Sequence, residues 1–571
     1  MLSVAKIRHG GERYYFASLA AEERQAGLRE APGTYLGAGA AELGLSGTVE
    51  LGEFSRLLAG EHPRERTVTL SASHHRVEIV AFDCTFSAPK AVSVLERLAP
   101  SELASPARHA HERAVGSALA YLEREAAVVR RQIAGDRVAV AASGVIAAGF
   151  VHHTSRAPDP HLHTHVVIAN LARDPLGRYS ALDARRLFFE LAAVRSLYEA
   201  ELRFLLSTEL GVRWRRAEHG GIDLLGITAT TRAAFSRRSA AIAEHLAQGG
   251  WSSPKAAALA ALRTRPPKDR ETALEDLETP WRAQAARSGL AASRWRRVAP
   301  ERPVTPKIDG AAALAGIDGP FSRSDLLVAI ARQALGGAPV AALEAQADRL
   351  LALGGIRRIE PAPLVLRGPG RPIPVGMRLP RYRREGAIED ERRLRELLRP
   401  APAILDALRG LAGGGLVVLE MGSAAGAARL CELMATTRRS GVAVHAWGAD
   451  DAARAWLEQR GVASPALVVP IASARSVTVL LGADRARLSQ LRALAEQAQR
   501  KGADVVLVID ATPRAAPGSQ RAVLRAVAQR LERGPDRGDR GKEMSRERGD
   551  FLGPRRGVQR LEQRQGWQRW R

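Results

Sequence analysis

The chain has 571 residues, of which 46% are hydrophobic and 26% are charged. This composition is typical of a globular protein with several domains and excludes a disordered or collagen-like chain. Lys and Arg total 85 against 61 Asp and Glu, which gives a net charge of +24 and an isoelectric point near 11.1. Such an excess favours a polyanionic partner, although a GC-rich genome would also enrich Arg.

Cysteine content and hydropathy indicate the compartment. Two cysteines, Cys84 and Cys431, are too few for a disulfide framework and favour a reducing environment. The first residues lack the pattern of a signal peptide, and no apolar run reaches the about 18–20 residues of a membrane span. We therefore expect a soluble, cytoplasmic protein.

The first 300 residues alternate strand-like and helix-like patterns. The run Val77–Phe86 is rich in β-branched and aromatic residues and precedes a turn signal at Ser87–Pro89, which predicts a strand. Residues 103–130 and 191–210 are rich in Ala, Glu, Arg and Leu, which predicts two helices. Residues 264–309 carry many Pro and Arg, and we place a domain boundary there.

Three regions follow this boundary. Residues 310–390 contain two amphipathic helices, around Ser322–Ala334 and Pro339–Leu353, and predict a small helical or winged linker domain. Residues 391–530 alternate helices with short apolar strands, which predicts a buried parallel sheet. The tail, residues 531–571, is rich in Gly, Arg, Asp and Gln, and we predict that it is basic and disordered.

A cluster of histidines is the sharpest signal in the chain. Five of the 14 histidines lie within residues 152–165. The runs Val138–His153 and His161–Leu171 are strand-like, and the seven residues between them include two prolines. This pattern predicts a β-hairpin whose arms carry the histidines.

The hairpin would bring several imidazoles together. Alternation along a strand places His161, His163 and His165 on one face, and the hairpin places His152 roughly opposite them. Three imidazoles on one face make a divalent-cation site with open coordination positions. Three neutral ligands leave the ion's charge uncancelled, which suits an ion that polarises a phosphate oxygen. The alternative is a set of ordinary histidines or a purely structural zinc.

The segment 152–165 reads His-His-Thr-Ser-Arg-Ala-Pro-Asp-Pro-His-Leu-His-Thr-His. It resembles the three-histidine motif of MobF-type conjugative relaxases, the TrwC/TraI-like nicking enzymes of plasmid transfer. Other segments of the first 300 residues also resemble this family and follow its order: Met1–Ser3, Tyr14–Tyr15, Gly37–Leu45, Phe82–Lys90 and Tyr179–Ala184.

The resemblance implies a fold and a reaction for residues 1–300. The fold would be an α/β, two-layer domain with a central antiparallel sheet and covering helices. The phenolate of Tyr14 would attack the scissile phosphate of single-stranded DNA and leave a 5′-phosphotyrosine and a free 3′-hydroxyl, with Tyr15 as the alternate nucleophile. Without the histidines, a Tyr-Tyr pair would instead indicate packing of an amphipathic helix.

The resemblance also implies roles around the phosphate. His152, His163 and His165 would bind the metal ion, and His161, which strand alternation also allows, would be a second-shell or substitute ligand. Asp83 would accept a hydrogen bond from a ligand imidazole and would help to deprotonate the tyrosine. The cofactor would be a divalent ion, namely Mg, Mn, Zn or Ni.

Two basic residues and one departure complete the implied site. Lys90 and Arg156 would contact DNA phosphates. Many family members carry a second tyrosine pair some residues after the first, but the corresponding region here, Ala20–Gly33, has none. Either Tyr14 and Tyr15 share the work or a single strand transfer occurs.

The region 391–530 weakly resembles the first RecA-like unit of the helicase that follows the nicking domain in larger relaxases. Leu416–Arg429 stands where a phosphate loop is expected, but it lacks the Lys and the hydroxyl of a working loop. Ala511 follows the strand Val505–Asp510 where a catalytic Glu is expected. We predict a degenerate RecA-like domain without ATP, ATPase or helicase activity; an ordinary doubly wound domain is the alternative.

The leading hypothesis is a metal-dependent, site- and strand-specific DNA nickase and strand transferase that acts on single-stranded DNA at an origin of transfer. A coupling protein and accessory relaxosome proteins would be its further partners. One alternative is a rolling-circle replication initiator or transposase with the same chemistry. The other is a degenerate homologue that only binds DNA.

Overall fold

The computed structural model divides the chain into two compact units, Met1–Glu389 and Asp390–Arg571, and each is described by itself. The described residues are 1–10, 33–133, 136–217, 221–250, 253–265, 274–290, 295–298, 308–317, 319–359, 380–397, 416–421, 443–448, 476–481, 488–501 and 504–510. The first unit contains both the predicted N-terminal domain and the predicted small helical domain.

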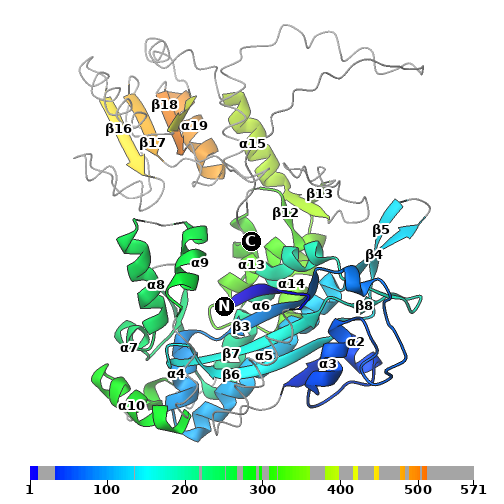
Figure 1. Cartoon of the computed structure of the whole chain (residues 1–571). Helices are drawn as coiled ribbons and strands as arrows, with labels where there is room; N and C mark the ends of the chain where they lie inside the picture. The colour runs from blue at the N-terminus through cyan, green and yellow to red at the C-terminus, as the bar shows by residue number, and fades with distance from the viewer. Residues whose placement is uncertain are drawn as a thin grey trace, which may run out of the picture. The chain divides into compact units, whose positions relative to one another are not determined.

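A five-stranded sheet forms the centre of the first unit (Figure 1). Its strand order is β1-β3-β7-β6-β2, and every neighbouring pair is antiparallel. The strands are β1 (Leu2–Arg8), β2 (Thr34–Leu36), β3 (Ile79–Ser87), β6 (Ala147–Thr154) and β7 (Pro160–Ala169). The expected central antiparallel sheet and the β6–β7 hairpin are therefore confirmed.

Helices cover one face of this sheet. Phe82, Cys84 and Phe86 alternate along β3 and are buried on that face in the main core. The covering helices are α4 (Lys90–Leu98), α5 (Ser101–Ala126) and α6 (Ala184–Leu210). The predicted helices at 103–130 and 191–210 correspond to α5 and α6, so the two-layer prediction holds. Helix α5 ends at Ala126, however, and residues 128–130 already belong to a strand, Val128–Ile133.

Small residues allow α5 and α6 to approach each other closely. Fully buried alanines recur on α5 at helical spacing, at Ala107, Ala110, Ala114 and Ala118. Helix α6 begins where the Asp183 side chain accepts a hydrogen bond from the Arg185 backbone N–H, and it ends at Gly211, whose φ of 67° suits glycine.

The opposite face of the sheet carries a smaller core at one end. Phe54 and Leu57 of α3 (Leu51–Leu58) are buried with Ala148 and Val167 of the sheet. Along the chain, helix α2 (Ala38–Glu42) precedes α3, and the 3-10 helix η1 (His74–Arg76) follows it. By strand alternation, the same face continues along β6 and β7 to the histidine cluster.

The prediction of one strand over Val138–His153 is wrong, because the chain breaks near Gly144. The first half is β5 (Asp136–Ala141), which pairs with β4 (Val128–Ile133) in a separate hairpin, and the second half is β6. The Glu123 carboxylate accepts a hydrogen bond from the Val145 N–H at 2.7 Å. A Cβ at Gly144 would lie only 2.6 Å from that carboxylate, so glycine is needed there.

Short elements surround this body. Two small hairpins are formed by β8 (Ala172–Arg173) with β9 (Tyr179–Ser180) and by β10 (Trp214–Arg216) with β11 (Ile222–Leu224). The following helices are α7 (Ala229–Ala234), α8 (Arg237–Gln248), α9 (Pro254–Arg263), α10 (Leu274–Arg287) and α11 (Trp295–Val298).

The predicted helices near 322–334 and 339–353 are confirmed as α13 (Arg323–Gln333) and α14 (Val340–Ala352). Ser322 and Asp325 form a capping box at the start of α13. The neighbouring elements are α12 (Gly310–Ala315), β12 (Phe321–Ser322), β13 (Ile356–Ile359), β14 (Arg381–Arg384) and α15 (Glu385–Leu397).

Buried polar contacts attach these helices to α6. The guanidinium of Arg203 donates to the carbonyls of Ala331, Ala334 and Leu335 at 3.0–3.2 Å. The Val340 N–H, at the start of α14, donates to the Glu201 carboxylate at 2.6 Å. Helices α13 and α14 therefore share the main core of the first unit.

In the second unit, the described residues include a four-stranded parallel sheet with the order β15-β18-β17-β16. This matches the expected parallel sheet. Its strands are β15 (Leu416–Met421), β16 (Ala443–Gly448), β17 (Ser476–Leu481) and β18 (Asp504–Asp510), and α19 (Leu488–Lys501) lies between the last two in sequence. Residues 422–429, Ala511 and the predicted tail lie outside the described residues. Among the described helices, none combines the length and apolar character that a membrane span requires.

Candidate metal centre

The hairpin gathers the predicted histidines. His152 of β6 is directly opposite His163 of β7 in the ladder, and His165 follows two residues later on the same face. The ring centroids lie 5.3 Å apart for His152 and His163, 5.2 Å for His152 and His165, and 5.1 Å for His163 and His165. The three imidazoles are thus mutual neighbours.

An acidic residue orients one of these rings. Asp83 of β3, which is 4% exposed, has its carboxylate oxygens 2.9 and 3.0 Å from Nδ1 of His165. The hydroxyl of Thr85 lies 3.1 Å from the same nitrogen and 3.2 Å from the Asp83 carboxylate. Since the ring donates from Nδ1, its Nε2 carries the lone pair that a metal ligand needs.

A backbone carbonyl orients a second ring. Nδ1 of His163 lies 2.8 Å from the His161 carbonyl oxygen, so this ring also donates from Nδ1. Burial, followed by the neighbouring histidines, holds the pKa of His163 well below its usual range. The neutral imidazole, which is the form that binds metal, is therefore favoured.

His161 lies next to this cluster, with its ring centroid 4.6 Å from that of His163. Burial, together with the charge of Lys90, lowers its pKa to about 4. His153 points to the opposite face, where its Nδ1 lies 3.2 Å from the Glu96 carboxylate of α4. The hairpin thus separates His153 from the cluster, as alternation predicts.

The spacing of the rings fits a metal ion, but the side chains need adjustment. In a tetrahedral site with metal–nitrogen distances of about 2.0–2.1 Å, the centroids of two ligand imidazoles lie about 5 Å apart. The observed 5.1–5.3 Å agrees with this spacing. Within the described residues, no three His, Cys, Asp or Glu side chains are already arranged to hold an ion. Ring rotations would therefore be required for His152, His163 and His165 to converge.

The remaining predicted site residues have different placements. The ammonium of Lys90 donates to the Pro160 carbonyl at 2.6 Å, and burial lowers its pKa to about 8. Arg156 is half-buried in the turn between β6 and β7. Tyr14 and Tyr15 lie outside the described residues, so their distance from the histidines is not defined here. The phosphate contacts of Lys90 and Arg156 stay predictions.

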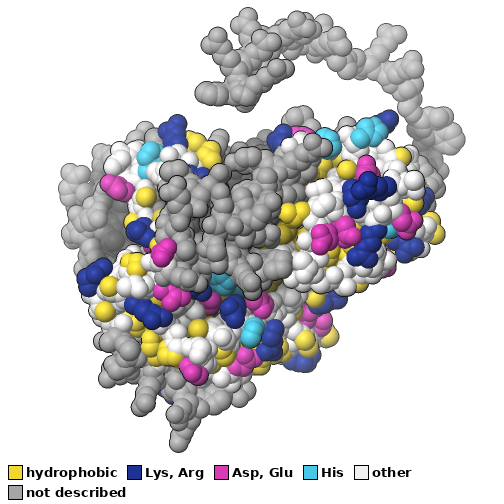
Figure 2. All heavy atoms as spheres, turned by 60° about the horizontal axis from the view of Figure 1, so that its bottom comes forward, with side chains coloured by type: hydrophobic (Ala, Val, Ile, Leu, Met, Phe, Trp, Pro, Cys, Tyr) yellow, Lys and Arg dark blue, Asp and Glu magenta, His cyan; other side chains and the backbone are white. Residues whose placement is uncertain are grey.

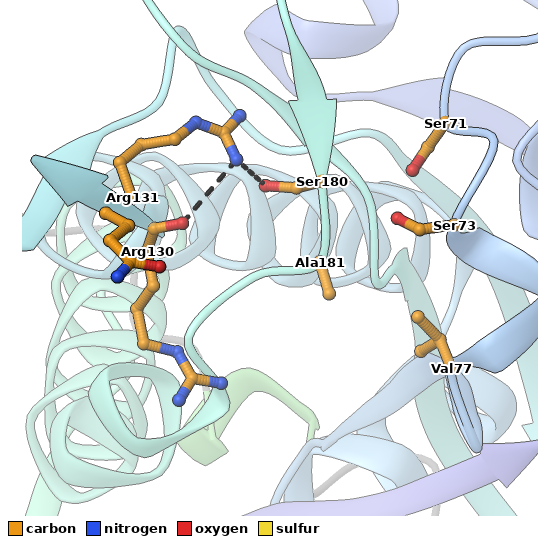
Figure 3. Close-up of a pocket in the computed structure, with 8 residues that line it drawn as sticks. Ser71, Ser73, Val77, Arg130, Arg131, Ser180 and Ala181 are labelled. Carbon is orange, nitrogen blue, oxygen red and sulfur yellow. Dashed lines mark hydrogen bonds between the residues drawn. The ribbon is translucent and has the colours of Figure 1, made fainter. Parts of the chain in front are cut away.

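The first unit also contains a cavity of about 410 Å³ beside β4, and its lining includes arginine and serine side chains (Figure 3). Arg130 and Arg131 of β4 stand on one side, and Ser71 and Ser73 stand on the other. Arg131 is held by the Asp174 carboxylate at 2.6 Å and the Ser180 hydroxyl at 2.8 Å. Arg130 is more exposed, with its Nε 3.4 Å from Asp183.

The face drawn in Figure 2 shows no single patch of basic side chains among the described residues. On the face drawn in Figure 2, Lys and Arg side chains are interspersed with Asp and Glu over the described residues. The net charge alone therefore does not locate a nucleic-acid interface, and the cavity beside Arg130 and Arg131 is a more specific candidate.

The chain is similar to known conjugative relaxases over the region that contains the histidine cluster. The family model of the TrwC relaxase matches residues 8–288. The multifunctional conjugation protein TraI of Escherichia coli is 33% identical over 245 residues, which cover 41% of this chain and 13% of TraI. TraI of E. coli strain K12 is 30% identical over 288 residues, or 47% of this chain and 15% of TraI. The chain thus matches less than a sixth of the length of these relatives.

Solved structures of the conjugative relaxase TrwC in complex with oriT DNA are also similar. The metal-bound structure has 30% sequence identity and a TM-score of 0.47, and the metal-free structure has 30% and 0.45. Each comparison covers 51% of this chain and 100% of the TrwC chain. The matched region contains the central antiparallel sheet and the three clustered histidines described above. The chain belongs to the TrwC relaxase family, and the expected family membership is confirmed.

Proposed function

We propose that this chain is a metal-dependent DNA nickase and strand transferase that acts at an origin of transfer. The observation that carries the proposal is the group of three imidazoles beside Asp83, on the strands that bear the family motif. The solved TrwC relatives, which include complexes with oriT DNA in metal-bound and copper-bound form, support both the DNA substrate and the need for a divalent ion. The identity of the ion is not part of the proposal.

His152, His163 and His165 would hold this ion. Once bound, it supplies a Lewis acid that stabilises negative charge on the non-bridging oxygens of the scissile phosphate. Asp83 keeps the His165 ring oriented through Nδ1, and the His161 carbonyl does the same for His163. Two of the three rings are therefore already oriented by protein groups, which lowers the cost of organising the site.

The reaction is a transesterification on Tyr14, with Tyr15 as the alternate nucleophile. The phenol has an ordinary pKa of about 10 and must lose its proton to react at neutral pH. Its oxygen forms a bond to phosphorus while the bond from phosphorus to the 3′-oxygen breaks. The 3′-oxygen takes up a proton and leaves as a hydroxyl, and Asp83 is the candidate group to assist removal of the phenol proton. Because the bond energy stays in the phosphotyrosine, rejoining needs no ATP.

The DNA would extend beyond the phosphate. One TrwC structure contains a 27-mer comprising the recognition hairpin and the cleavage site. The arginine-lined cavity beside β4 is a candidate contact for the phosphates of such DNA, with Arg130 as the more accessible cation. A coupling protein, accessory relaxosome proteins, a cytoplasmic location and the lack of ATPase activity remain predictions.

An adduct assay tests the proposal. The full chain is incubated with Mn²⁺ and a 5′- or 3′-labelled single-stranded oligonucleotide from the origin of transfer of its own element. A denaturation-resistant adduct is expected with the strand 3′ to the nick. It should be lost in the double variant Tyr14→Phe/Tyr15→Phe and in His163→Ala, but kept in the control Tyr179→Phe. DNA binding without any adduct would show that the chain is a degenerate, DNA-binding homologue.

A further inference from the structure

The turn that joins the two histidine-bearing strands is closed by its own polar groups. The Ser155 N–H donates to the Asp159 carbonyl at 2.9 Å. The Ser155 hydroxyl accepts from the N–H groups of Ala157 and Asp159 at 3.3 Å. The turn is therefore a compact unit, and a contact that fixes its position affects both β6 and β7.

Side chains far away in the sequence bind this turn. Nε of Arg237, at the start of α8, donates to Asp159 Oδ1 at 2.7 Å, and its backbone N–H donates to Oδ2 at 2.9 Å. A second nitrogen of the same guanidinium donates to the Pro158 carbonyl at 3.0 Å. The indole N–H of Trp281, in α10, donates to that carbonyl at 2.9 Å. From α4, Lys90 holds the Pro160 carbonyl.

The carboxylate and the indole in these contacts are buried, whereas the Arg237 side chain is 54% exposed. Asp159 is 1% exposed and Trp281 is 2% exposed. A carboxylate removed from water is stable only while cations and N–H groups satisfy it. Loss of the Arg237 guanidinium would leave Asp159 with the backbone N–H of residue 237 but without its cation. Movement of the turn away from α8 and α10 would therefore break the hydrogen bonds to Asp159 and Pro158.

The β ladder is irregular immediately after the pair of His152 and His163. The pairing of β6 with β7 shifts register between His152 and Thr154, immediately before the turn. Such an irregularity locally interrupts the ladder hydrogen bonds and adds a bend. Contacts from outside the sheet can hold the turn where the ladder is irregular. The contacts at Pro158 and Asp159 lie only a few residues from His152 and His163 in the chain.

We propose that Arg237 and Trp281 are positioning residues that brace the β6–β7 turn and so keep His152 opposed to His163. The inference rests on the metal centre proposed above. It assigns to α8 and α10 a role that the histidine motif does not contain, namely to set the geometry of the ligands through Asp159 and Pro158.

The adjacent Arg238 provides a matched control. Its guanidinium donates to the Thr264 hydroxyl at 2.9 Å and to the Ala261 carbonyl, so it ties α8 to the end of α9 rather than to the hairpin. Arg237→Ala and Arg238→Ala remove the same charge from neighbouring positions of one helix. Trp281→Phe is a milder variant that keeps an aromatic ring but removes the indole N–H together with part of the ring system.

Two measurements on the full chain test the brace. Amide hydrogen exchange of peptides from residues 150–165 is expected to be about tenfold faster or more in Arg237→Ala than in Arg238→Ala, because the buried Asp159 carboxylate loses its cation. Co²⁺ affinity, followed by visible absorption, is expected to fall about tenfold in Arg237→Ala, as for other groups that support metal ligands, and about threefold in Trp281→Phe. Arg238→Ala should stay within about twofold of the wild type, since it does not touch the hairpin.

The outcomes separate the two proposals. Equal exchange and equal Co²⁺ affinity in Arg237→Ala and Arg238→Ala would overturn the brace. If Arg237→Ala does not fold, Trp281→Phe provides the test. An exchange rate at residues 150–165 of Trp281→Phe equal to that of the wild type would then overturn the brace. Failure of the wild type to bind Co²⁺ would instead overturn the metal centre, while the exchange comparison would still decide whether Arg237 holds the turn.

Discussion

Nδ1 of His165 lies 2.9 Å from Oδ2 of Asp83, across two adjacent strands of the sheet. The carboxylate is buried and reaches the ring from β3, while the other two imidazoles lie on β6 and β7. A carboxylate in this position fixes the tautomer of a ligand and increases its basicity. Asp83 therefore affects any bound ion through His165.

We expect Asp83→Asn to lower metal affinity by about 10- to 100-fold, since the charge that supports His165 is lost. The adduct yield at limiting Mn²⁺ should fall accordingly, and titration calorimetry checks the affinity directly. Saturating Mn²⁺ should restore the yield if Asp83 acts only through His165. A defect that persists at saturation would show instead that Asp83 also assists proton removal from the tyrosine.

The residues that the sequence located best are those that a local pattern defines. Alternation and the two prolines were sufficient to predict the hairpin and to place His152, His163 and His165 on one face, because both depend on near neighbours in the chain. The Asp83 contact followed only from the family resemblance, since it joins strands about 80 residues apart in sequence.

Contacts between distant side chains were not predictable in this way. The break at Gly144 depends on Glu123, which comes from α5. Nothing in the sequence near Arg237 or Trp281 indicates that either binds the turn at Asp159, because neither lies in a motif of its own. A lone Trp in an otherwise polar, charged helix was a weak signal that this face is buried.

Arg130 offers a test of the cavity beside β4. If its guanidinium contacts a DNA phosphate, Arg130→Gln should weaken DNA binding and reduce the slope of log affinity against log salt by about 0.7–0.9. Fluorescence anisotropy over a salt series measures both quantities. Arg113→Gln is a suitable control, because Arg113 is an exposed arginine on α5 outside the cavity lining. Equal slopes for the two variants would exclude a phosphate contact by Arg130.

The attachment of α13 and α14 to α6 predicts that a cut near residue 300 is harmful. A chain of residues 1–300 would leave Arg203 without its three carbonyl acceptors and Glu201 without the Val340 N–H. Each unsatisfied buried group costs about 1–3 kcal/mol. We therefore expect residues 1–300 to melt roughly 10 °C or more below residues 1–397 in differential scanning calorimetry. Matching melting temperatures would mean that the docked helices contribute little.

The last prediction concerns His111, which joins the helical layer to β7. Its Nδ1 lies 2.8 Å from the Tyr198 hydroxyl, and its Nε2 lies 2.8 Å from the hydroxyl of Thr164, which stands between the proposed ligands His163 and His165. Complete burial lowers the pKa of His111 from 6.5 to about 3 in the folded protein. Between these values the unfolded chain binds a proton that the folded chain does not. Stability from this group is therefore complete above pH 6.5 and is lost as the pH falls toward 3.

Between pH 5.5 and 4.5, this difference contributes a loss of about 1.4 kcal/mol in the free energy of unfolding. Burial also lowers the pKa of His74, His161 and His163, which act in the same direction, so the comparison must isolate His111. In His111→Gln the decline over this interval should be shallower by about that amount, because glutamine does not titrate. Urea unfolding at three pH values with EDTA present measures the slopes. A wild-type slope in His111→Gln would mean that His111 takes up its proton equally in the folded and unfolded chain, against the burial seen here.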